Sequence, residues 1–493
     1  MPTRTSCPKA YRPAFAVLFG LALAACSSTG PIPAVRLPAA AAFQANRGWV
    51  PAKPMASTPR GSWWAIFGDP ILDRLENQVA QANQSLQSAL AAYDQATALV
   101  DANRAARYPV LGASLSASRS RSGNSTLSGT GVQAGAANTY DAGLAASWIP
   151  DLWGRVRLEV AAAQAGTRAS AETLLATQLS LQSTLAETYL LLRVTDARIA
   201  LGDRAVAAYR QALQLTQNRY RAGVATEADI AQARTQLLSA QVARTDLTVQ
   251  RAQDAHAIAV LIGRPASNFS LLPVPTLPVV PLIPAGVPAQ MLARRPDLAS
   301  AEQTLAQANA QIGVARTAWL PNLMLSAQAD ASASRLAELG SAPSLFWSLG
   351  PALSATVFDG GARRAQLASA KARYRQAVAD YRQTALTAFQ QVEDNLAAQR
   401  ILEHEAALQR QTVQAAETSL RLVVNQYKAG VVPYLDVIVA QSTATGAQDA
   451  ALTLLGRRLA ASVGLIQALG GGWGGAARPM AGAPPVRETN IAS

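Results

Sequence analysis

Few side chains of this 493-residue sequence could carry out chemistry at a site. Its two histidines, His256 and His404, lie in long helix-forming segments, and its two cysteines are Cys7 and Cys26. Metal sites and histidine-based hydrolysis need several such groups close together, and neither histidine has a cysteine or the other histidine nearby. No glycine-rich loop follows a strand in the way that a nucleotide site requires. The sequence therefore predicts no enzyme activity, no metal and no cofactor other than a covalent lipid.

Cys26 is the residue for which the sequence predicts that lipid. Residues 1–25 begin with basic side chains and continue with an apolar run that ends in Leu23-Ala24-Ala25, the pattern of an export signal that is removed. Small residues before a cysteine resemble a bacterial lipobox, so we expect Cys26 to become the acylated first residue of a lipoprotein, carrying palmitate. Ser27 is not acidic, which in lipoproteins implies transfer to the outer membrane. The alternative is an ordinary signal peptide with a chance cysteine at this position.

A repeat with a fixed offset runs through the chain and indicates two similar halves. The segment Arg219-Tyr220-Arg221-Ala222-Gly223-Val224 recurs 207 residues later as Gln426-Tyr427-Lys428-Ala429-Gly430-Val431. An aspartate follows each segment at the same offset, Asp229 in the first half and Asp436 in the second. Duplication explains these matches better than chance.

Each half contains a long stretch that favours uninterrupted helix. Residues 362–429 contain neither Gly nor Pro, and residues 155–222 contain two glycines but no proline. At about 1.5 Å per residue, each stretch would form a rod of roughly 100 Å that ends at an Ala-Gly step. Leading helices are expected over 70–107 and 296–317, and returning helices over 226–262 and 434–469. Such helices must bury their apolar stripes against one another in a coiled or barrel-like array.

Between the leading helices and the rods, four segments alternate with period two and are predicted to be strands. They cover about 108–120, 138–149, 320–332 and 345–358. One face of each is apolar, the other is small or polar, and aromatic side chains mark both ends, as in strands of a water-filled membrane barrel. The alternative is a pair of soluble hairpins with one face on a core, a reading that period two alone leaves open. Four strands are too few to close a barrel, since the smallest single-chain examples have about eight, so the chain is predicted to oligomerise.

The formal net charge of +13 comes from basic residues that are scattered among alanine, glutamine and acidic residues. A basic balance is compatible with nucleic acid or anionic lipid as a partner. An exported chain rarely meets nucleic acid, so we interpret the arginines as solvated helix faces and expect no nucleic-acid partner.

The expected domain organisation follows the repeat. It comprises a signal peptide (1–25), a lipid anchor and N-terminal arm (26–62), a first repeat (63–272), a Pro-rich linker (273–288), a second repeat (289–469) and a disordered tail (470–493). The predicted fold class is mainly α with a membrane β-barrel part.

Short blocks of sequence stand in one order along nearly all of the mature chain. They are Trp63-Trp64, Phe67-Gly68-Asp69-Pro70, Asp151-Leu152-Trp153-Gly154-Arg155, Arg294-Arg295-Pro296-Asp297-Leu298, Ile312-Gly313-Val314-Ala315-Arg316, Phe358-Asp359-Gly360-Gly361 and Val392-Glu393-Asp394. Together they resemble the outer-membrane factor family of TolC-like channels, the outer membrane efflux proteins, and in particular its NodT-type lipoprotein branch. Several blocks in the right order are much more specific than any one of them.

The resemblance implies a homotrimer in the cell outer membrane, lipid-anchored and extending into the periplasm. Each chain would give four strands to a shared β-barrel and its long helices to a periplasmic α-barrel tunnel. The implied function is a passive gated duct that exports drugs or other small molecules, working with a periplasmic adaptor (membrane fusion) protein and an inner-membrane pump of the resistance-nodulation-division (RND) type. Two alternatives stay open: the duct of a type I protein secretion system, and a structural coiled-coil lipoprotein that acts as a spacer.

The resemblance also implies roles for the repeated residues. In this family the periplasmic tip is closed by contacts between a second-repeat tyrosine and a first-repeat acid, and by a ring of aspartates. The matching gate positions are Tyr427, Asp229 and Asp436. Adaptors dock at the tips, where Tyr220, Gly223 and Gly430 lie, although a glycine there also simply ends a helix.

Both aspartates have a structural alternative. Thr226 and Asp229 are spaced like a capping box, a role that is compatible with gating. Asp436 lies in the first turn after Pro433, where a negative charge suits the helix dipole.

The sequence departs from the TolC pattern at the second tip. Val431 or Val432 stands where a basic residue is expected, and Val439 stands where a second acid is expected. We therefore expect apolar contacts to hold the closed tip more than ion pairs do.

Overall fold

The computed structural model describes residues 61–121, 136–274, 276–283 and 294–471. The predicted signal peptide, Cys26, and most of the predicted arm and tail lie outside the described residues. The chain divides into two compact units. The first, which we call the sheet unit, contains residues 92–170 and 301–381, and the second, the helical unit, contains the described parts of 37–91, 171–300 and 382–493.

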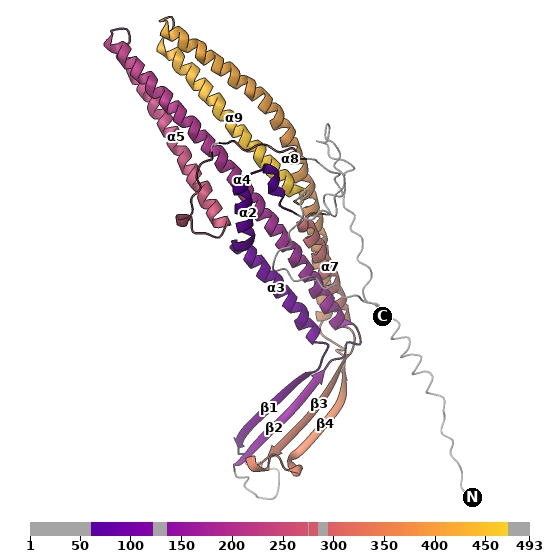
Figure 1. Cartoon of the computed structure of the whole chain (residues 1–493). Coiled ribbons are helices and arrows are strands. Elements are labelled where there is room, and N and C mark those ends of the chain that lie inside the picture. Colours follow the sequence, from indigo (N-terminus) through magenta and orange to yellow (C-terminus); the bar gives the residue numbers. More distant parts are fainter. Residues whose placement is uncertain (1–60, 122–135, 275, 284–293, 472–493) are drawn as a thin grey trace, which may run out of the picture. The chain divides into compact units, whose positions relative to one another are not determined.

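The strands of the sheet unit form one antiparallel sheet with the order β1-β2-β3-β4. They are β1 Val110–Ser120, β2 Ala137–Trp148, β3 Asn322–Ala333 and β4 Leu345–Ser354 (Figure 1). β4 ends before the expected boundary at 358, because its partner β3 begins at Asn322 and the preceding Pro321 has no N–H to continue the ladder.

Three kinds of helix occur once in each half of the chain, with the same length in both. α4 Arg155–Arg221 and α8 Ala362–Lys428 have 67 residues each, α5 Glu227–Leu261 and α9 Tyr434–Ala468 have 35 each, and α3 Gln84–Ala105 and α7 Pro296–Thr317 have 22 each. The predicted fold class, mainly helical with long rods and four strands, is confirmed. Over the described ranges, no helix combines the length and the apolar character that crossing a membrane demands.

The leading helix of the first half is interrupted, contrary to the prediction of one helix over 70–107. Helix α2 Pro70–Ala82 ends at Asn83, whose backbone is extended, and α3 begins at the next residue. The Asn83 side chain accepts the Leu86 N–H at 3.0 Å and donates to the Leu261 carbonyl at the end of α5 at 2.7 Å. One amide therefore caps the start of α3 and satisfies a carbonyl at the end of α5, which favours the break.

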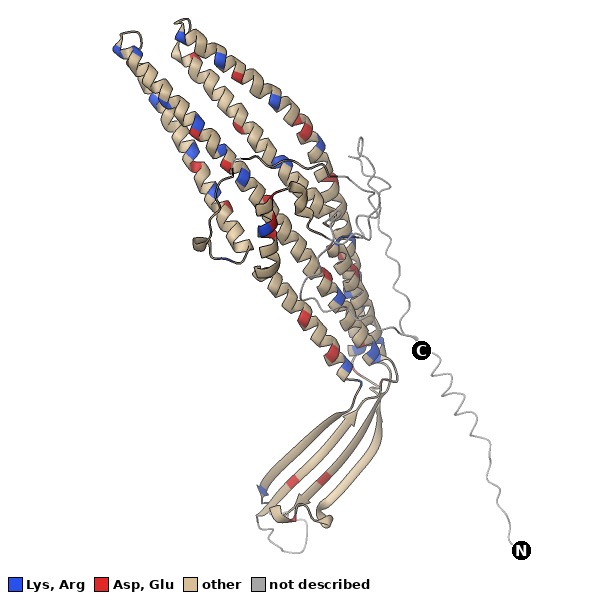
Figure 2. Cartoon of the chain, viewed as in Figure 1, with Lys and Arg blue, Asp and Glu red and all other residues tan. Residues whose placement is uncertain are grey.

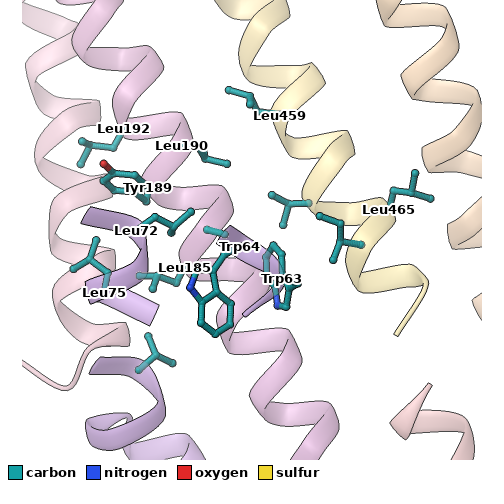
Figure 3. Packing of buried hydrophobic residues seen from close by; sticks show 14 of the residues in the cluster. Trp63, Trp64, Leu72, Leu75, Leu185, Tyr189, Leu190, Leu192, Leu459 and Leu465 are labelled. Carbon is teal, nitrogen blue, oxygen red and sulfur yellow. The ribbon is translucent and has the colours of Figure 1, made fainter. Parts of the chain in front are cut away.

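The main core lies in the helical unit. Trp63 and Trp64 of the short 3-10 helix η2 (Trp63–Phe67), Leu72 of α2, Leu185 of α4 and Leu465 of α9 are all buried in one cluster (Figure 3). Burial of these apolar side chains is the main favourable term that holds α2 and η2 on the long helices.

A buried polar network fastens the start of α2 to α4. Asp69 Oδ1 accepts the Ile71 N–H at 2.8 Å and so caps α2, while Oδ2 accepts the Tyr189 hydroxyl at 2.8 Å and the Arg193 guanidinium. Arg193 also donates to the Thr276 hydroxyl at 3.2 Å. Buried ions offset their loss of hydration only when they are paired and hydrogen-bonded in this way, so this network fixes the described part of the linker against α4.

Charged side chains are dispersed along the helices, and few lie on the strands (Figure 2). Arg193 and Arg295 are buried and are exceptions to the interpretation of the arginines as solvated helix faces.

Candidate channel sheet and gate

One face of the sheet is apolar and exposed. In the strand register Leu144 of β2 lies opposite Ala113 of β1 and Ala329 of β3. The side chains of Leu115 on β1, Leu144 on β2 and Leu349 on β4 are 77%, 51% and 74% exposed. A soluble hairpin would bury its apolar face on a core, and these leucines are not buried, so the alternative of soluble hairpins is disfavoured.

The opposite face carries small and polar residues. Asp141 of β2 accepts a hydrogen bond from Ser116 on β1 at 3.1 Å and another from Ser332 on β3 at 2.7 Å. Asp330 lies over Gly143, where a Cβ would be only 2.0 Å from its Oδ1, so a side chain at 143 would displace that carboxylate. A sheet with one apolar face and one hydrogen-bonded polar face suits a boundary between lipid and water.

β1 and β4 are the two edges of this sheet, and within the described chain each pairs with a single strand. An unpaired strand edge leaves backbone N–H and C=O groups without partners, which is prohibitively costly in lipid. The sheet unit therefore presents two unpaired strand edges.

The helix hairpins α4–α5 and α8–α9 turn through nearly identical loops. Gly223 and Gly430 have φ angles of 75° and 78°, the left-handed region that favours glycine. The valine N–H after each glycine donates to a carbonyl in the last turn of the preceding helix, at 3.0 Å in the first loop and 2.9 Å in the second. Both glycines therefore end a helix, and the valine that follows each one is exposed at the tip.

Asp229 forms a capping box at the start of α5. Its Oδ2 accepts the Thr226 N–H at 2.8 Å, and its own N–H donates to the Thr226 hydroxyl at 3.2 Å. The carboxylate is therefore engaged within its own hairpin. The capping box, which is the structural alternative to a gating role, accounts for the contacts of Asp229 in the protomer.

Tyr427, at the end of α8, is 5% exposed and is the centre of a contact between the two hairpins. The Arg219 guanidinium lies 4.6 Å from its ring centroid, and Arg219 Nη1 donates to its carbonyl oxygen at 3.1 Å. Its ring also packs against Tyr434 at a centroid distance of 5.6 Å. Among the described residues of one protomer, no hydrogen bond joins the Tyr427 hydroxyl to Asp229.

Asp436 lies in the first turn of α9 and is exposed. The neighbouring Leu435 and Val439 are also exposed, whereas Val437 and Ile438 are buried. Asp436 therefore belongs to the outward face of the tip and is separate from Tyr427 and its contacts. The structure brings neither aspartate to Tyr427, and it brings Arg219 there instead.

Burial raises the pKa of Tyr434 to about 12, with smaller contributions from the nearby Tyr427 and Tyr209. Its hydroxyl is neutral near pH 7. His256 and His404 are exposed, and in the part of the chain that the structure describes no group of three His, Cys, Asp or Glu side chains is placed to hold a metal ion.

The sequence profile of the outer membrane efflux proteins matches residues 75–264 and 287–471 of this chain. The pyoverdine export outer membrane protein OpmQ of Pseudomonas aeruginosa is 35% identical over 416 residues, which cover 83% of this chain and 87% of OpmQ. The chain belongs to the outer membrane efflux protein family.

Two further comparisons agree. The toluene efflux pump outer membrane protein TtgI of Pseudomonas putida is 33% identical over 410 residues, which cover 83% of this chain and 87% of TtgI. The solved outer-membrane channel OprN matches with a TM-score of 0.81 and 28% identity, over 90% of this chain and 99% of that chain. The resemblance to TolC-like efflux channels, the outer-membrane location and the efflux function are therefore confirmed.

Sequence reasoning missed Arg219 in this outer membrane efflux protein. The segment that contains Arg219 was aligned with its repeat, but the matching residue in the second half is Gln426, so the repeat gave no reason to select it. The available signal was the difference between the halves: the basic Arg219 precedes Tyr220, whereas the uncharged Gln426 precedes Tyr427. Cys26 lies outside the described residues, and its acylation stays a prediction.

Proposed function

We propose that three copies of this outer membrane efflux protein form one passive, gated duct through the outer membrane, as part of a tripartite efflux system. The observation that carries the proposal is the sheet with an exposed apolar face, a polar opposite face and two open edges. In lipid this sheet is stable only if its edges are paired, and three chains that each give four strands would close one barrel.

The long helices supply the rest of the passage. α4 and α8, with 67 residues each, begin shortly after β2 and β4 in the chain and form the walls of the periplasmic part of the duct in this proposal. A wide aqueous passage selects weakly, because few side chains contact each solute. The duct therefore leaves the choice of solute to the pump.

The duct is not an enzyme in this proposal, and the energy for export comes from other proteins. The partners are a periplasmic adaptor and an inner-membrane RND pump. The adaptor docks at the hairpin tips around Tyr220, Gly223 and Gly430, where Tyr220 is 45% exposed and the valine after each glycine offers an apolar contact. Exposed apolar side chains at a tip are a favourable contact for such a partner.

Cys26 carries the lipid anchor in this proposal, and no other cofactor is needed. A single cysteine that remains after removal of the signal has no disulfide partner within the chain. Acyl chains on Cys26 would add membrane affinity to that of the strands.

Asp436 is the proposed ring residue of the gate. It is exposed in the first turn of α9, and three copies around one axis would place three carboxylates at the tip. Such a ring favours cations and repels anions. Asp229 and Tyr427 then support the tip from within the protomer.

Small molecules are the proposed solutes. The relatives above are named for pyoverdine export and toluene efflux, which supports small solutes over polypeptides. A type I secretion duct stays the second candidate. A coiled-coil spacer is less well supported, because a spacer has no use for a sheet with an exposed apolar face.

Planar-bilayer conductance of purified trimers tests this proposal. We expect discrete, cation-preferring openings from the wild type, and a weaker cation preference in Asp436→Asn. Asp246→Asn is the matched control, since Asp246 is an exposed carboxylate on α5 away from the tip. Fully assembled trimers that never conduct would overturn the duct, and equal effects of the two substitutions would overturn the aspartate ring.

A further inference from the structure

The tip of each protomer contains an apolar cluster that joins the two helix hairpins. We call it the tip cluster, and its buried members are Ala233, Tyr427, Tyr434, Val437 and Ile438, with Ala212, Leu213, Val423, Val424 and Val432 packed against them. Ala212, Leu213 and Ala233 come from the first repeat, and the others come from the second. Separation of the hairpins would expose this cluster to water, so it favours the closed arrangement.

Arg219 is the charged residue that contacts this cluster at its centre. It comes from the last turn of α4, and its guanidinium lies 4.6 Å from the centroid of the Tyr427 ring. The same guanidinium donates to the Tyr427 carbonyl oxygen at 3.1 Å. That oxygen lies at the C-terminus of α8, where the helix dipole adds an attraction for a cation.

The rest of the tip supports a special role for this arginine. Within the described chain, Arg219 forms no ion pair with a carboxylate, and its contacts are with the ring and the carbonyl of Tyr427. The Tyr427 hydroxyl has no hydrogen bond to Asp229, which is held by Thr226. Val431 or Val432 stands where the TolC pattern has a basic residue.

The repeat shows that the arrangement is one-sided. Tyr220 and Tyr427 are equivalent residues of the two halves, but Tyr220 is 45% exposed and Tyr427 is 5% exposed. The residue equivalent to Arg219 is Gln426, which carries no charge. A cation of the first hairpin therefore contacts an aromatic ring of the second, and the reverse contact is absent among the described residues.

We propose that Arg219 is the positioning residue of the gate. It holds the second hairpin against the first through the ring and the carbonyl of Tyr427, in place of a contact between the tyrosine hydroxyl and an acid. The inference rests on the proposed duct function, because it assigns the residue that stabilises the closed state of that duct. Opening then requires an adaptor to break or replace the contact between Arg219 and Tyr427.

Single-channel recording of assembled trimers tests the contact of Arg219 with the ring and the carbonyl of Tyr427, which we call the Arg219 latch. Arg219→Gln removes the charge, and we expect the ratio of open to closed time to rise by about ten-fold or more, since a cation over an aromatic ring and a charged hydrogen bond are both lost. Arg219→Lys keeps the charge and should restore most of the closed time. Arg221→Gln is the matched control, because Arg221 is an exposed arginine in the same turn that contacts Asn218 of its own helix.

Two substitutions of Tyr427 separate the ring from the hydroxyl. Tyr427→Phe keeps the ring and the carbonyl, so the Arg219 latch predicts that this variant stays closed, whereas a hydroxyl-to-acid latch predicts that it opens. Tyr427→Leu removes the aromatic face but keeps apolar bulk and the backbone carbonyl, so it should open the duct in the same direction as Arg219→Gln but less. Combining Tyr427→Leu with Arg219→Gln should add little to Arg219→Gln alone, because the arginine change already removes the contact with the ring.

If wild-type trimers conduct but Arg219→Gln and Arg221→Gln have the same open time, the Arg219 latch is overturned and the duct stays intact. Opening by Tyr427→Phe would also overturn it. If correctly assembled wild-type trimers and all variants fail to conduct, the duct itself is wrong and the latch falls with it.

Discussion

A charge placed on the apolar face of the sheet provides a quantitative test of the membrane assignment. Leu144 is four residues from the end of β2 at Trp148, or about 13 Å along the strand. At a tilt of about 40° this is roughly 10 Å of depth, close to the midplane of an apolar band about 25 Å tall. Arginine at such a depth costs about 2–4 kcal/mol. Leu144→Arg should therefore lower the free energy of unfolding by that amount per chain, or roughly 30- to 700-fold in the folding equilibrium.

The matched control is Ala145→Arg, which places the same charge one residue along the same strand, on the polar face opposite Gly112 and Gln328. We expect this variant to stay within about 1 kcal/mol of the wild type, because its charge meets water. The assay is urea unfolding of protein that has been refolded into lipid vesicles, followed by tryptophan fluorescence. Equal losses in the two variants, or a larger loss in Ala145→Arg, would refute the assignment of the two faces.

Two more predictions concern a buried acid and the lipid anchor. Burial, with a smaller contribution from Asp73, raises the pKa of Glu76 on α2 well above its usual 4.5. The folded state therefore keeps a proton that the unfolded state loses as pH rises above 4.5, and stability falls with rising pH by up to about 1.4 kcal/mol per pH unit until the folded pKa is passed. Glu76→Gln should match the wild type near pH 4.5 and exceed it increasingly toward pH 7.5 in urea titrations, and a constant difference across this range would contradict the buried neutral acid. Cys26→Ala should lose incorporation of an alkyne-labelled palmitate while Cys7→Ala, a change within the predicted signal, keeps it; labelling of Cys26→Ala would show that the lipid lies elsewhere.

The helices and strands follow from local sequence. Residues 362–429 have no Gly or Pro and form α8, Ala362–Lys428, while alternation with period two marks all four strands. These patterns are local, because helix propensity and side-chain periodicity act within a few turns or residues. The end of β4 was misplaced because it depends on the partner strand, where Pro321 precedes the first residue of β3.

The contacts that decide the helix break at Asn83 and the candidate gate join residues far apart in sequence. Asn83 interrupts a helical segment because its amide reaches the Leu261 carbonyl, 178 residues away. Arg219 and Tyr427 meet because two hairpins of the repeat lie side by side at the tip cluster. The repeat marked both tyrosines and their loops, and the family resemblance selected Tyr427, but a pair of equivalent tyrosines gives no indication of which one is buried. That asymmetry arises only when the two halves pack.

The central claim is that this outer membrane efflux protein exports small molecules, and the most direct test is dye accumulation in cells. Deletion of the gene should raise the steady-state level of a fluorescent efflux dye, and a plasmid copy of the wild type should restore the low level while a Leu144→Arg copy should not. Unchanged dye levels together with loss of a polypeptide from the medium would contradict the account in favour of a protein secretion duct. Unchanged dye and unchanged secretion would contradict it in favour of a structural lipoprotein.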